Sequence, residues 1–295
     1  MDVVVFGAGS LGSLVGGLLA RAHDVTLVGR EPHVGAVAES GLRISGAVET
    51  RVWPDAATAP PATADLAVVT VKAGDTESAA DALAGTDLDG ALSLQNGLGN
   101  EDVLADRLDC PVLAGTCTYG ARLDAPGHVA CTGVGEVALG ARDGGPSALA
   151  DRVGEAFAAA DIETTVSPEM PRRLWEKLAV NAGINATTAL ARVDNGALVD
   201  GPASETAREA AREVARVAGD EGVSLPAADA AAAVAEVATA TAENTSSMHQ
   251  DVLAGRPTEI DAINGYVVDV AQRPVPVNEA LAGLVRAWER ANADR

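Results

Sequence analysis

Three polar side chains recur at intervals of four residues in a stretch that has the pattern of an amphipathic helix. They are Lys177, Asn181 and Asn185. Residues at positions i and i+4 lie on nearly the same face of a helix, so an ammonium group and two carboxamides form one polar stripe. Such a stripe suits a small, oxygen-rich anion. What that anion is depends on the elements that position the stripe.

A glycine-rich motif follows the first apolar run of the chain. Residues 2–6 have the pattern of a buried parallel strand, and residues 7–12 read Gly-Ala-Gly-Ser-Leu-Gly before a helix-like stretch. Between a strand and a helix, G-x-G-x-x-G is the dinucleotide-binding fingerprint, with one glycine for the turn, one for phosphate approach and one for packing. We therefore expect a cofactor loop made of Gly7, Ala8, Gly9, Ser10, Leu11 and Gly12.

The end of the second predicted strand, residues 24–28, bears on which dinucleotide binds. An NAD-preferring site usually has an acidic residue there, which bonds the ribose hydroxyls. Here Gly29 and Arg30 occupy that place, and an arginine can pair with a 2′-phosphate. NADPH is therefore favoured, and NADH stays possible. In the alternative interpretation Arg30 is a solvated loop residue and Glu31 binds the ribose.

Two later apolar runs, residues 65–71 and 91–95, have the pattern of buried strands and end at Lys72 and Asn96. Ligands of open α/β sheets bind at the carboxyl ends of the strands, so both side chains are expected at the cofactor edge. Either residue could instead belong to a simple loop. The β-prone runs 127–131 and 136–139 are expected to add strands to the same sheet.

The composition changes near residue 167, where Pro168 and Pro171 precede a helical pattern that continues to the end of the chain. We predict an α/β protein with an N-terminal Rossmann-type dinucleotide-binding domain, residues 1–167, followed by an all-α domain, residues 168–295. In the second domain, the spacing of Asn244 and Ser247 predicts one helical face. Glu259 is expected in the first turn of the next helix, where a carboxylate can also act only by stabilising the helix N-terminus.

The charge balance limits the classes of partner. The net charge is −21, from 42 acidic and 21 basic residues, which argues against nucleic acid and anionic membranes as partners. No long apolar run or basic leader is evident, so we expect a cytoplasmic protein. Lys72 and Lys177 are the only lysines, and scarce lysine with abundant acid resembles a halophilic composition. The cysteines have no C-x-x-C spacing, so no metal site is expected.

Several motifs spread along the chain match one family. Besides the glycine loop, they are Thr-Val-Lys-Ala at 70–73, Gln-Asn-Gly-Leu-Gly at 95–99, Leu-Trp-Glu-Lys-Leu-Ala-Val-Asn at 174–181, Glu-Asn-Thr-Ser-Ser-Met at 243–248 and Pro-Thr-Glu-Ile-Asp at 257–261. With them the chain resembles the ketopantoate reductases (2-dehydropantoate 2-reductases). The resemblance implies an active site in the cleft between the domains. It also implies NADPH-dependent reduction of ketopantoate to pantoate, in pantothenate and coenzyme A biosynthesis, and a homodimer is a possible assembly.

The resemblance also implies residue roles. Lys177 would be the general acid that protonates the ketone oxygen, and Glu259 would lie close to it at the nicotinamide and ribose end. Asn96 would contact cofactor and substrate, Lys72 would contact the cofactor, and Gly120 matches a cofactor-contacting stretch. The substrate hydroxyl and carboxylate would be held by Asn181, Asn185, Asn195, Asn244 and Ser247, while Lys177 and Asn96 would also bind the substrate.

Two alternatives stay open at this point. One is a related reductase of the same fold that acts on another 2-oxo acid or forms an opine-type product. The other is a redox-sensing nucleotide-binding protein without catalysis, which would need the glycine loop and Arg30 but not the polar stripe at 177–185 with Glu259.

Overall fold

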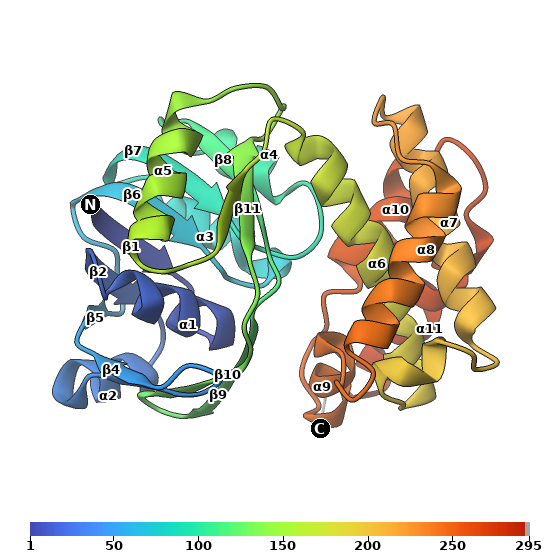
Figure 1. Cartoon of the computed structure of the whole chain (residues 1–295), viewed down its shortest axis with the longest axis horizontal. Helices are drawn as coiled ribbons and strands as arrows, with labels where there is room; N and C mark the ends of the chain where they lie inside the picture. The colour runs from blue at the N-terminus through green and yellow to red at the C-terminus, as the bar shows by residue number, and fades with distance from the viewer. Residues whose placement is uncertain (293–295) are drawn as a thin grey trace. The chain divides into compact units, whose positions relative to one another are not determined.

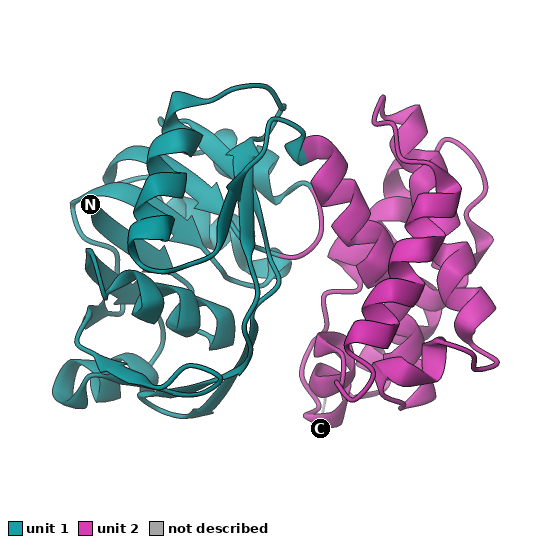
Figure 2. Ribbon diagram, in the orientation of Figure 1, with its two compact units in different colours: residues 1–95, 99–170 teal, residues 96–98, 171–295 magenta. Residues whose placement is uncertain are grey.

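The computed structural model describes residues 1–292, and these form two compact units (Figure 2). The first unit comprises residues 1–95 and 99–170, and the second comprises residues 96–98 and the chain from Pro171 onward. The division thus falls after Met170, and a short segment that follows a strand of the first unit is grouped with the second. Each unit has its own hydrophobic core.

The first unit is built on an eight-stranded sheet with the order β12-β11-β8-β7-β6-β1-β2-β5 (Figure 1). The six neighbouring strands β5, β2, β1, β6, β7 and β8 are parallel, and their order is that of a Rossmann fold. From β1 the chain first adds strands on one side, and with β6 it begins to add them on the other side of β1. The strands span Asp2–Phe6 (β1), Asp24–Val28 (β2), Asp55–Ala57 (β5), Thr63–Val69 (β6), Asp87–Ser93 (β7), Val112–Cys117 (β8), Val137–Ala141 (β11) and Thr164–Val166 (β12).

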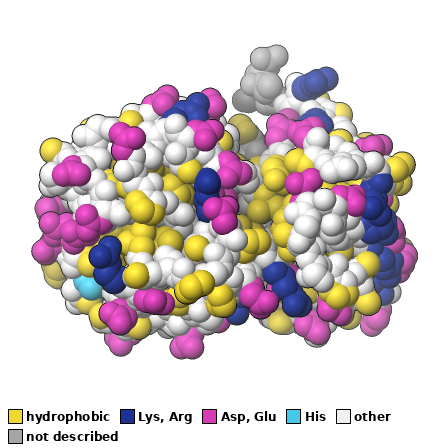
Figure 3. Space-filling model, turned by 90° about the horizontal axis from the view of Figure 1, so that it is seen from above, with side chains coloured by type: hydrophobic (Ala, Val, Ile, Leu, Met, Phe, Trp, Pro, Cys, Tyr) yellow, Lys and Arg dark blue, Asp and Glu magenta, His cyan; other side chains and the backbone are white. Residues whose placement is uncertain are grey.

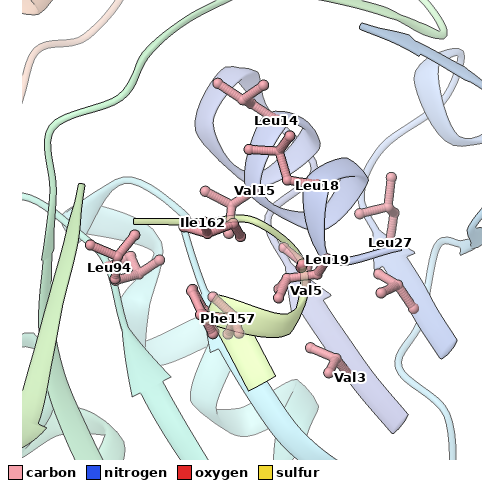
Figure 4. Packing of buried hydrophobic residues seen from close by; sticks show 14 of the residues in the cluster. Val3, Val5, Leu14, Val15, Leu18, Leu19, Leu27, Leu94, Phe157 and Ile162 are labelled. Atoms are coloured by element: carbon pink, nitrogen blue, oxygen red, sulfur yellow. The ribbon is translucent and has the colours of Figure 1, made fainter. Parts of the chain in front are cut away.

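Alternation along β1 explains why this sheet is covered on both faces. Successive side chains of a strand point to opposite faces, and Val3 and Val5 belong to one hydrophobic cluster while Val4 belongs to another. Figure 4 shows the first cluster, to which Leu14 and Leu18 of α1 and Phe157 of α5 all belong. The helices of this unit span Ser10–Leu19 (α1), His33–Ser40 (α2), Thr76–Leu83 (α3), Asn100–Ala105 (α4) and Ala148–Ala159 (α5), with a short 3₁₀ turn at Ala73–Asp75 (η1).

A second, four-stranded sheet corrects one sequence expectation. Its order is β4-β3-β10-β9, with bounds Thr50–Val52 (β4), Leu42–Gly46 (β3), His128–Gly133 (β10) and Gly120–Ala125 (β9). The run at 127–131 therefore does not extend the main sheet, because β10 pairs in parallel with β3. The run at 136–139 does extend it, as β11, which pairs antiparallel with β8. Alternating hydrophobicity predicts a strand but not its partner.

The second unit is helical, as predicted, and residues 171–292 contain no β-strand. Its elements span Met170–Ala191 (α6), Ser204–Asp220 (α7), Ala227–Ala240 (α8), Ser247–Leu253 (α9), Tyr266–Val270 (α10) and Pro276–Asn292 (α11), with a 3₁₀ turn at Asn195–Leu198 (η2) and a π-helical turn at Asp261–Gly265 (η3). α6 ends where Arg192 takes a positive φ of 55°, a common way to terminate a helix.

The surface carries the acidic character of the composition. Asp and Glu side chains are scattered over the face shown in Figure 3, together with groups of Lys and Arg side chains. Within residues 1–292, no helix has both the length and the apolar character needed to cross a bilayer.

Candidate active site

The glycine loop between β1 and α1 is shaped by contacts that glycine permits. Gly7 has a φ of +109°, and a Cβ there would lie 2.7 Å from the backbone nitrogen of Val71. A Cβ at Gly12 would overlap the Gly7 carbonyl oxygen. A Cβ at Gly9, by contrast, would meet no heavy atom closer than 3.9 Å, which leaves the backbone open to a ligand on that side.

The first turn of α1 is suited to an anion. Its N-cap residue, Gly9, makes no side-chain cap, and the turn contains no acidic residue. The first N–H groups of a helix lack intrahelical partners and form the positive end of its dipole. A pyrophosphate is the kind of group that such a loop and helix accept. The residues present therefore fit a dinucleotide.

A threonine of the Thr-Val-Lys-Ala motif, for which no role was predicted, holds this loop from the neighbouring strand. Thr70 follows β6, and its hydroxyl donates to the Gly7 carbonyl oxygen at 2.9 Å. Two residues later, Lys72 is half-buried, and its carbonyl oxygen accepts the Asp75 N–H at 2.8 Å. The strand β6 ends at Val69, two residues earlier than predicted, so Lys72 lies three residues past the strand end.

Gln95, from the Gln-Asn-Gly-Leu-Gly motif, is a second residue for which no role was predicted. Its side chain is 4% exposed, and Nε2 donates to the Val71 carbonyl oxygen at 3.1 Å and to the Thr76 hydroxyl at 2.7 Å. The first of these bonds fixes the backbone immediately before Lys72, and the second joins Gln95 to the start of α3. The available signal was its place, because Gln95 directly precedes Asn96 at a predicted strand end.

The turn after β2 contains Gly29, Arg30 and Glu31. Gly29 occupies the position that follows the strand, and a Cβ there would lie 2.7 Å from the Cβ of Ala8 in the glycine loop. Arg30 is exposed. The carboxylate of Glu31 accepts the Gly35 N–H of α2 at 3.2 Å, so it is already engaged at the start of that helix.

A buried histidine connects the Arg30 turn to the glycine-loop helix. His33 Nδ1 accepts the Gly127 N–H at 3.1 Å, so Nε2 carries the proton and donates to the Ser13 hydroxyl at 2.9 Å. Burial lowers the pKa of His33, because desolvation disfavours the imidazolium. The backbone N–H of His33 donates in turn to the Arg30 carbonyl oxygen at 3.2 Å.

The β9–β10 hairpin also approaches α1. The Ser10 hydroxyl accepts the Leu123 N–H of β9 at 3.0 Å. Gly120 opens β9, and a side chain there would overlap the Thr132 hydroxyl. The hydrogen bond from Leu123 to Ser10 therefore links the strand that begins at Gly120 to the glycine loop.

In the second unit, α6 carries the polar stripe. Lys177 and Asn181 are half-buried and Asn185 is 6% exposed, while Leu178, Ala182 and Ile184 pack into the core. Helical spacing places the ammonium and the two amides on one side of α6. The stripe therefore offers one cation and amide groups that can donate to an anion, as proposed from the sequence.

Asn96 and Glu259 lie together in the second unit. Asn96 Nδ2 donates to Glu259 Oε2 at 3.0 Å. The following residue, Gly97, has a φ of +84°, and its backbone packs so closely against Ala262 that a Cβ would overlap the Ala262 carbonyl oxygen. Glu259 does not lie in a helical turn as expected. It occupies a bend before η3, and its carbonyl oxygen accepts the Ala262 and Ile263 N–H groups, each at 3.1 Å.

Asn195 and Asn244 are also brought together, although not on a helix. The Asn195 N–H donates to the Asn244 carbonyl oxygen at 3.0 Å, and Asn195 Nδ2 donates to the Thr241 hydroxyl at 2.9 Å. Oδ1 of Asn195 is buried and has no hydrogen-bond partner among the described residues.

The predicted helical face from Asn244 to Ser247 is wrong. Asn244 precedes α9, which begins only at Ser247, because the Ser246 hydroxyl caps that helix by accepting the His249 N–H at 3.2 Å. The same hydroxyl bonds the Thr188 hydroxyl of α6 at 2.7 Å. Ser246 is therefore buried and structural, whereas Ser247 is exposed.

The fold and these residues define a class of protein. The strand order and the glycine loop are those of a Rossmann-type dinucleotide-binding oxidoreductase, with a helical unit that carries an ammonium and several amides. The family model for ketopantoate reductase PanE/ApbA matches residues 3–144, and the model for the C-terminal part of the same family matches residues 169–289. The chain belongs to the ketopantoate reductase family.

Individual relatives agree over their whole length. The 2-dehydropantoate 2-reductase of Halobacterium salinarum is 48% identical, covering 98% of this chain and 99% of that protein. The 2-dehydropantoate 2-reductase of Archaeoglobus fulgidus is 42% identical, with 97% of each chain covered.

Solved structures are similar too. The ketopantoate reductase of Ralstonia eutropha JMP134 has a TM-score of 0.91 at 35% identity, covering 99% of this chain and 100% of that one. D-mandelate dehydrogenase, solved with NADH and anilino(oxo)acetate, has a TM-score of 0.93 at 25% identity, covering 99% of each chain.

Proposed function

We propose that this protein reduces the C2 ketone of 2-dehydropantoate (ketopantoate) to pantoate with a nicotinamide dinucleotide. Its relatives are named 2-dehydropantoate 2-reductases. The observation that carries the proposal is the polar stripe of α6, with Lys177 followed at helical spacing by Asn181 and Asn185. Its ammonium group suits an anion that gains charge on oxygen during reaction. The relative from Halobacterium salinarum, 48% identical over nearly the whole chain, supports ketopantoate over another 2-oxo acid.

Lys177 supplies the proton in this proposal. Negative charge develops on the ketone oxygen as the carbonyl carbon accepts a hydride, which the dihydronicotinamide supplies when bound. The Lys177 ammonium stabilises that charge by a hydrogen bond and donates the proton that completes the hydroxyl group. The lysine recovers its proton from solvent, so the net change is the addition of a hydride and a proton to the ketone.

The amide side chains orient the substrate. Asn181 and Asn185 can donate to its carboxylate, since each amide has two N–H donors. Asn195 Oδ1, which is buried without a partner among the described residues, accepts the substrate hydroxyl. Asn244 and Ser247 are exposed, and we assign them to the same substrate. Glu259, bonded to Asn96, orients the ammonium and the cofactor's ribose.

We infer a preference for NADPH over NADH from the turn after β2. An acidic side chain cannot occupy position 29 without meeting Ala8, and the Glu31 carboxylate is bonded to Gly35. These contacts support Arg30 as the residue that pairs with a 2′-phosphate. Lys72, Gly120 and residues 7–12 are assigned to the remainder of the dinucleotide.

Product analysis tests the proposed reaction. The protein is incubated with NADPH and ketopantoate, and both NADP⁺ and pantoate are quantified by chromatography. We expect equal amounts of the two products and saturation by the ketone. Binding of NADPH without any ketone-dependent oxidation would instead indicate a nucleotide-binding protein that lacks catalysis.

A further inference from the structure

The segment that carries Glu259 is bound along its length by one helix. Thr258 precedes Glu259, and its N–H and hydroxyl both donate to Glu289 Oε1 of α11, each at 2.7 Å. The Thr258 hydroxyl also accepts the Ile260 N–H at 3.2 Å. Hydrogen bonds to a charged acceptor are about twice as strong as neutral ones. Glu289 therefore anchors Thr258 directly, and Thr258 in turn holds the Ile260 N–H on the other side of Glu259.

A second attachment lies at the other end of the segment. Asn264, which is fully buried in η3, donates through Nδ2 to the Asn278 carboxamide oxygen of α11 at 2.9 Å and to the Ala182 carbonyl oxygen of α6 at 3.0 Å. Ala182 lies between Asn181 and Asn185. This hydrogen bond thus links the Glu259 segment directly to α6, the helix that carries the polar stripe.

A buried carboxylate holds Asn278 itself. Glu213 of α7 is 1% exposed, and its Oε2 accepts both the backbone N–H and the side-chain amide of Asn278, at 2.9 and 2.8 Å. Its Oε1 accepts the Val277 N–H at 3.0 Å. The positive end of the α11 dipole stabilises this carboxylate, so the beginning of α11 is firmly placed.

The Glu259 segment and α11 are joined in antiparallel fashion, because residues further along the segment bond residues nearer the start of α11. Thr258 bonds Glu289 and Asn264 bonds Asn278, and Arg286 pairs between them with Asp261 at 2.7 Å. Glu289 and Asn278 are about 16 Å apart along the axis of α11, at 1.5 Å per residue. The Arg286–Asp261 pair is exposed, and exposed pairs contribute little.

We propose that Glu289 is a positioning residue for Glu259, acting through Thr258. It touches neither substrate nor cofactor in this account. Its carboxylate holds the Thr258 backbone so that the Glu259 side chain stays within reach of Asn96 and keeps its orientation toward the reacting groups. The inference rests on the proposed function of Glu259.

Kinetics of paired variants test the proposal. Glu289→Ala and the isosteric Thr258→Val should each lower kcat by about 10-fold or more, because small displacements of a reacting group are costly. Glu289→Gln and Thr258→Ser, which keep an acceptor and a hydroxyl respectively, should recover most of the loss. Glu236→Gln, an exposed carboxylate of α8, is the matched control and should match wild type.

A double-mutant cycle separates positioning from general destabilisation. In a Glu259→Gln background, Glu289→Ala should lower kcat less than about 2-fold further, because its effect passes through Glu259. An equal loss in both backgrounds, or near-normal turnover of both single variants, would overturn the proposal. If Glu289→Ala fails to fold, Thr258→Val replaces it in the double-mutant cycle with Glu259→Gln.

Hydrogen exchange keeps this test independent of the substrate. The amides of Ile260, Ala262 and Ile263 are bonded within the anchored segment. Their exchange in Glu289→Ala should be at least about 5-fold faster than in Glu236→Gln, since local opening becomes easier. Unchanged exchange in Glu289→Ala would overturn the role of Glu289 as an anchor, whatever the substrate is. If exchange is faster in Glu289→Ala but the wild-type protein does not reduce ketopantoate, only the proposed function is refuted.

Discussion

Asn96 Nδ2 donates a 3.0 Å hydrogen bond to Glu259 Oε2, although 163 positions separate the two residues in sequence. Asn96 lies three residues after the end of β7, and Glu259 lies two residues before the π-helical turn η3. The bond restrains one carboxylate oxygen of Glu259. It therefore supports a role for Glu259 in orientation.

Replacing Lys177 should abolish most of the chemistry. Lys177→Ala removes the proton donor and the positive charge that stabilises the developing alkoxide, so kcat should fall at least about 10²-fold with a modest change in NADPH affinity. Steady-state kinetics and a fluorescence titration measure the two effects. Lys72→Ala, at the only other lysine, should mainly raise the KM for NADPH. Near-normal turnover of Lys177→Ala would remove that residue as the acid.

Arg30 should distinguish the two nicotinamide cofactors. Arg30→Ala loses a charge-assisted contact worth about 1.5–3 kcal/mol, so the KM for NADPH should rise about 10- to 100-fold while that for NADH changes little. The exposed Arg152→Ala, on α5, is a control for the loss of one positive charge. Equal losses for both cofactors would mean that Arg30 does not read the 2′-phosphate.

His33 should make the first unit sensitive to acid. Its folded pKa is lowered by burial, so the unfolded chain binds a proton more readily than the folded one does. The stabilisation is complete above the unfolded pKa of about 6.5 and is lost as pH falls toward and through the lowered folded value. His33→Gln keeps a donor and an acceptor but does not titrate. Between pH 7.5 and 5, the wild-type Tm should fall further than that of His33→Gln, and parallel curves would contradict this assignment.

Salt should stabilise the protein if its acidic composition reflects a saline environment. The net charge of −21 makes the folded chain repel itself, and about 1 M salt shortens the Debye length to about 3 Å. The Tm should therefore rise steadily from low to molar KCl. A Tm that is flat or falling over this range would argue that the acidic surface has another origin.

Spacing alone was sufficient for the parts of the site that lie within one element. Lys177, Asn181 and Asn185 share a face of α6 because helical periodicity dictates it, and the glycine loop follows β1 for a similar local reason. Periodicity failed at Asn244, because the N-cap of Ser246 starts α9 later than the spacing implied. A single hydroxyl decided that boundary.

Residues that act on the backbone of others left no periodic signal. Thr70 and Gln95 donate to the carbonyl oxygens of Gly7 and Val71, contacts that depend on how separate strands align. The pairing of β10 with β3 was hidden for the same reason, since its register joins distant segments. Resemblance to a family suggested Glu259 as a site residue, but its bond to Asn96 came only from the structure.

Comparison of kcat/KM for ketopantoate and for 3,3-dimethyl-2-oxobutanoate tests the central claim most directly, because the two ketones differ only by the hydroxyl group. A site that bonds this hydroxyl through a buried acceptor such as Asn195 Oδ1 should favour ketopantoate by at least about 10²-fold, with NADPH as the reductant. Equal kcat/KM values, or a higher value for the analogue or another 2-oxo acid, would contradict ketopantoate as the substrate.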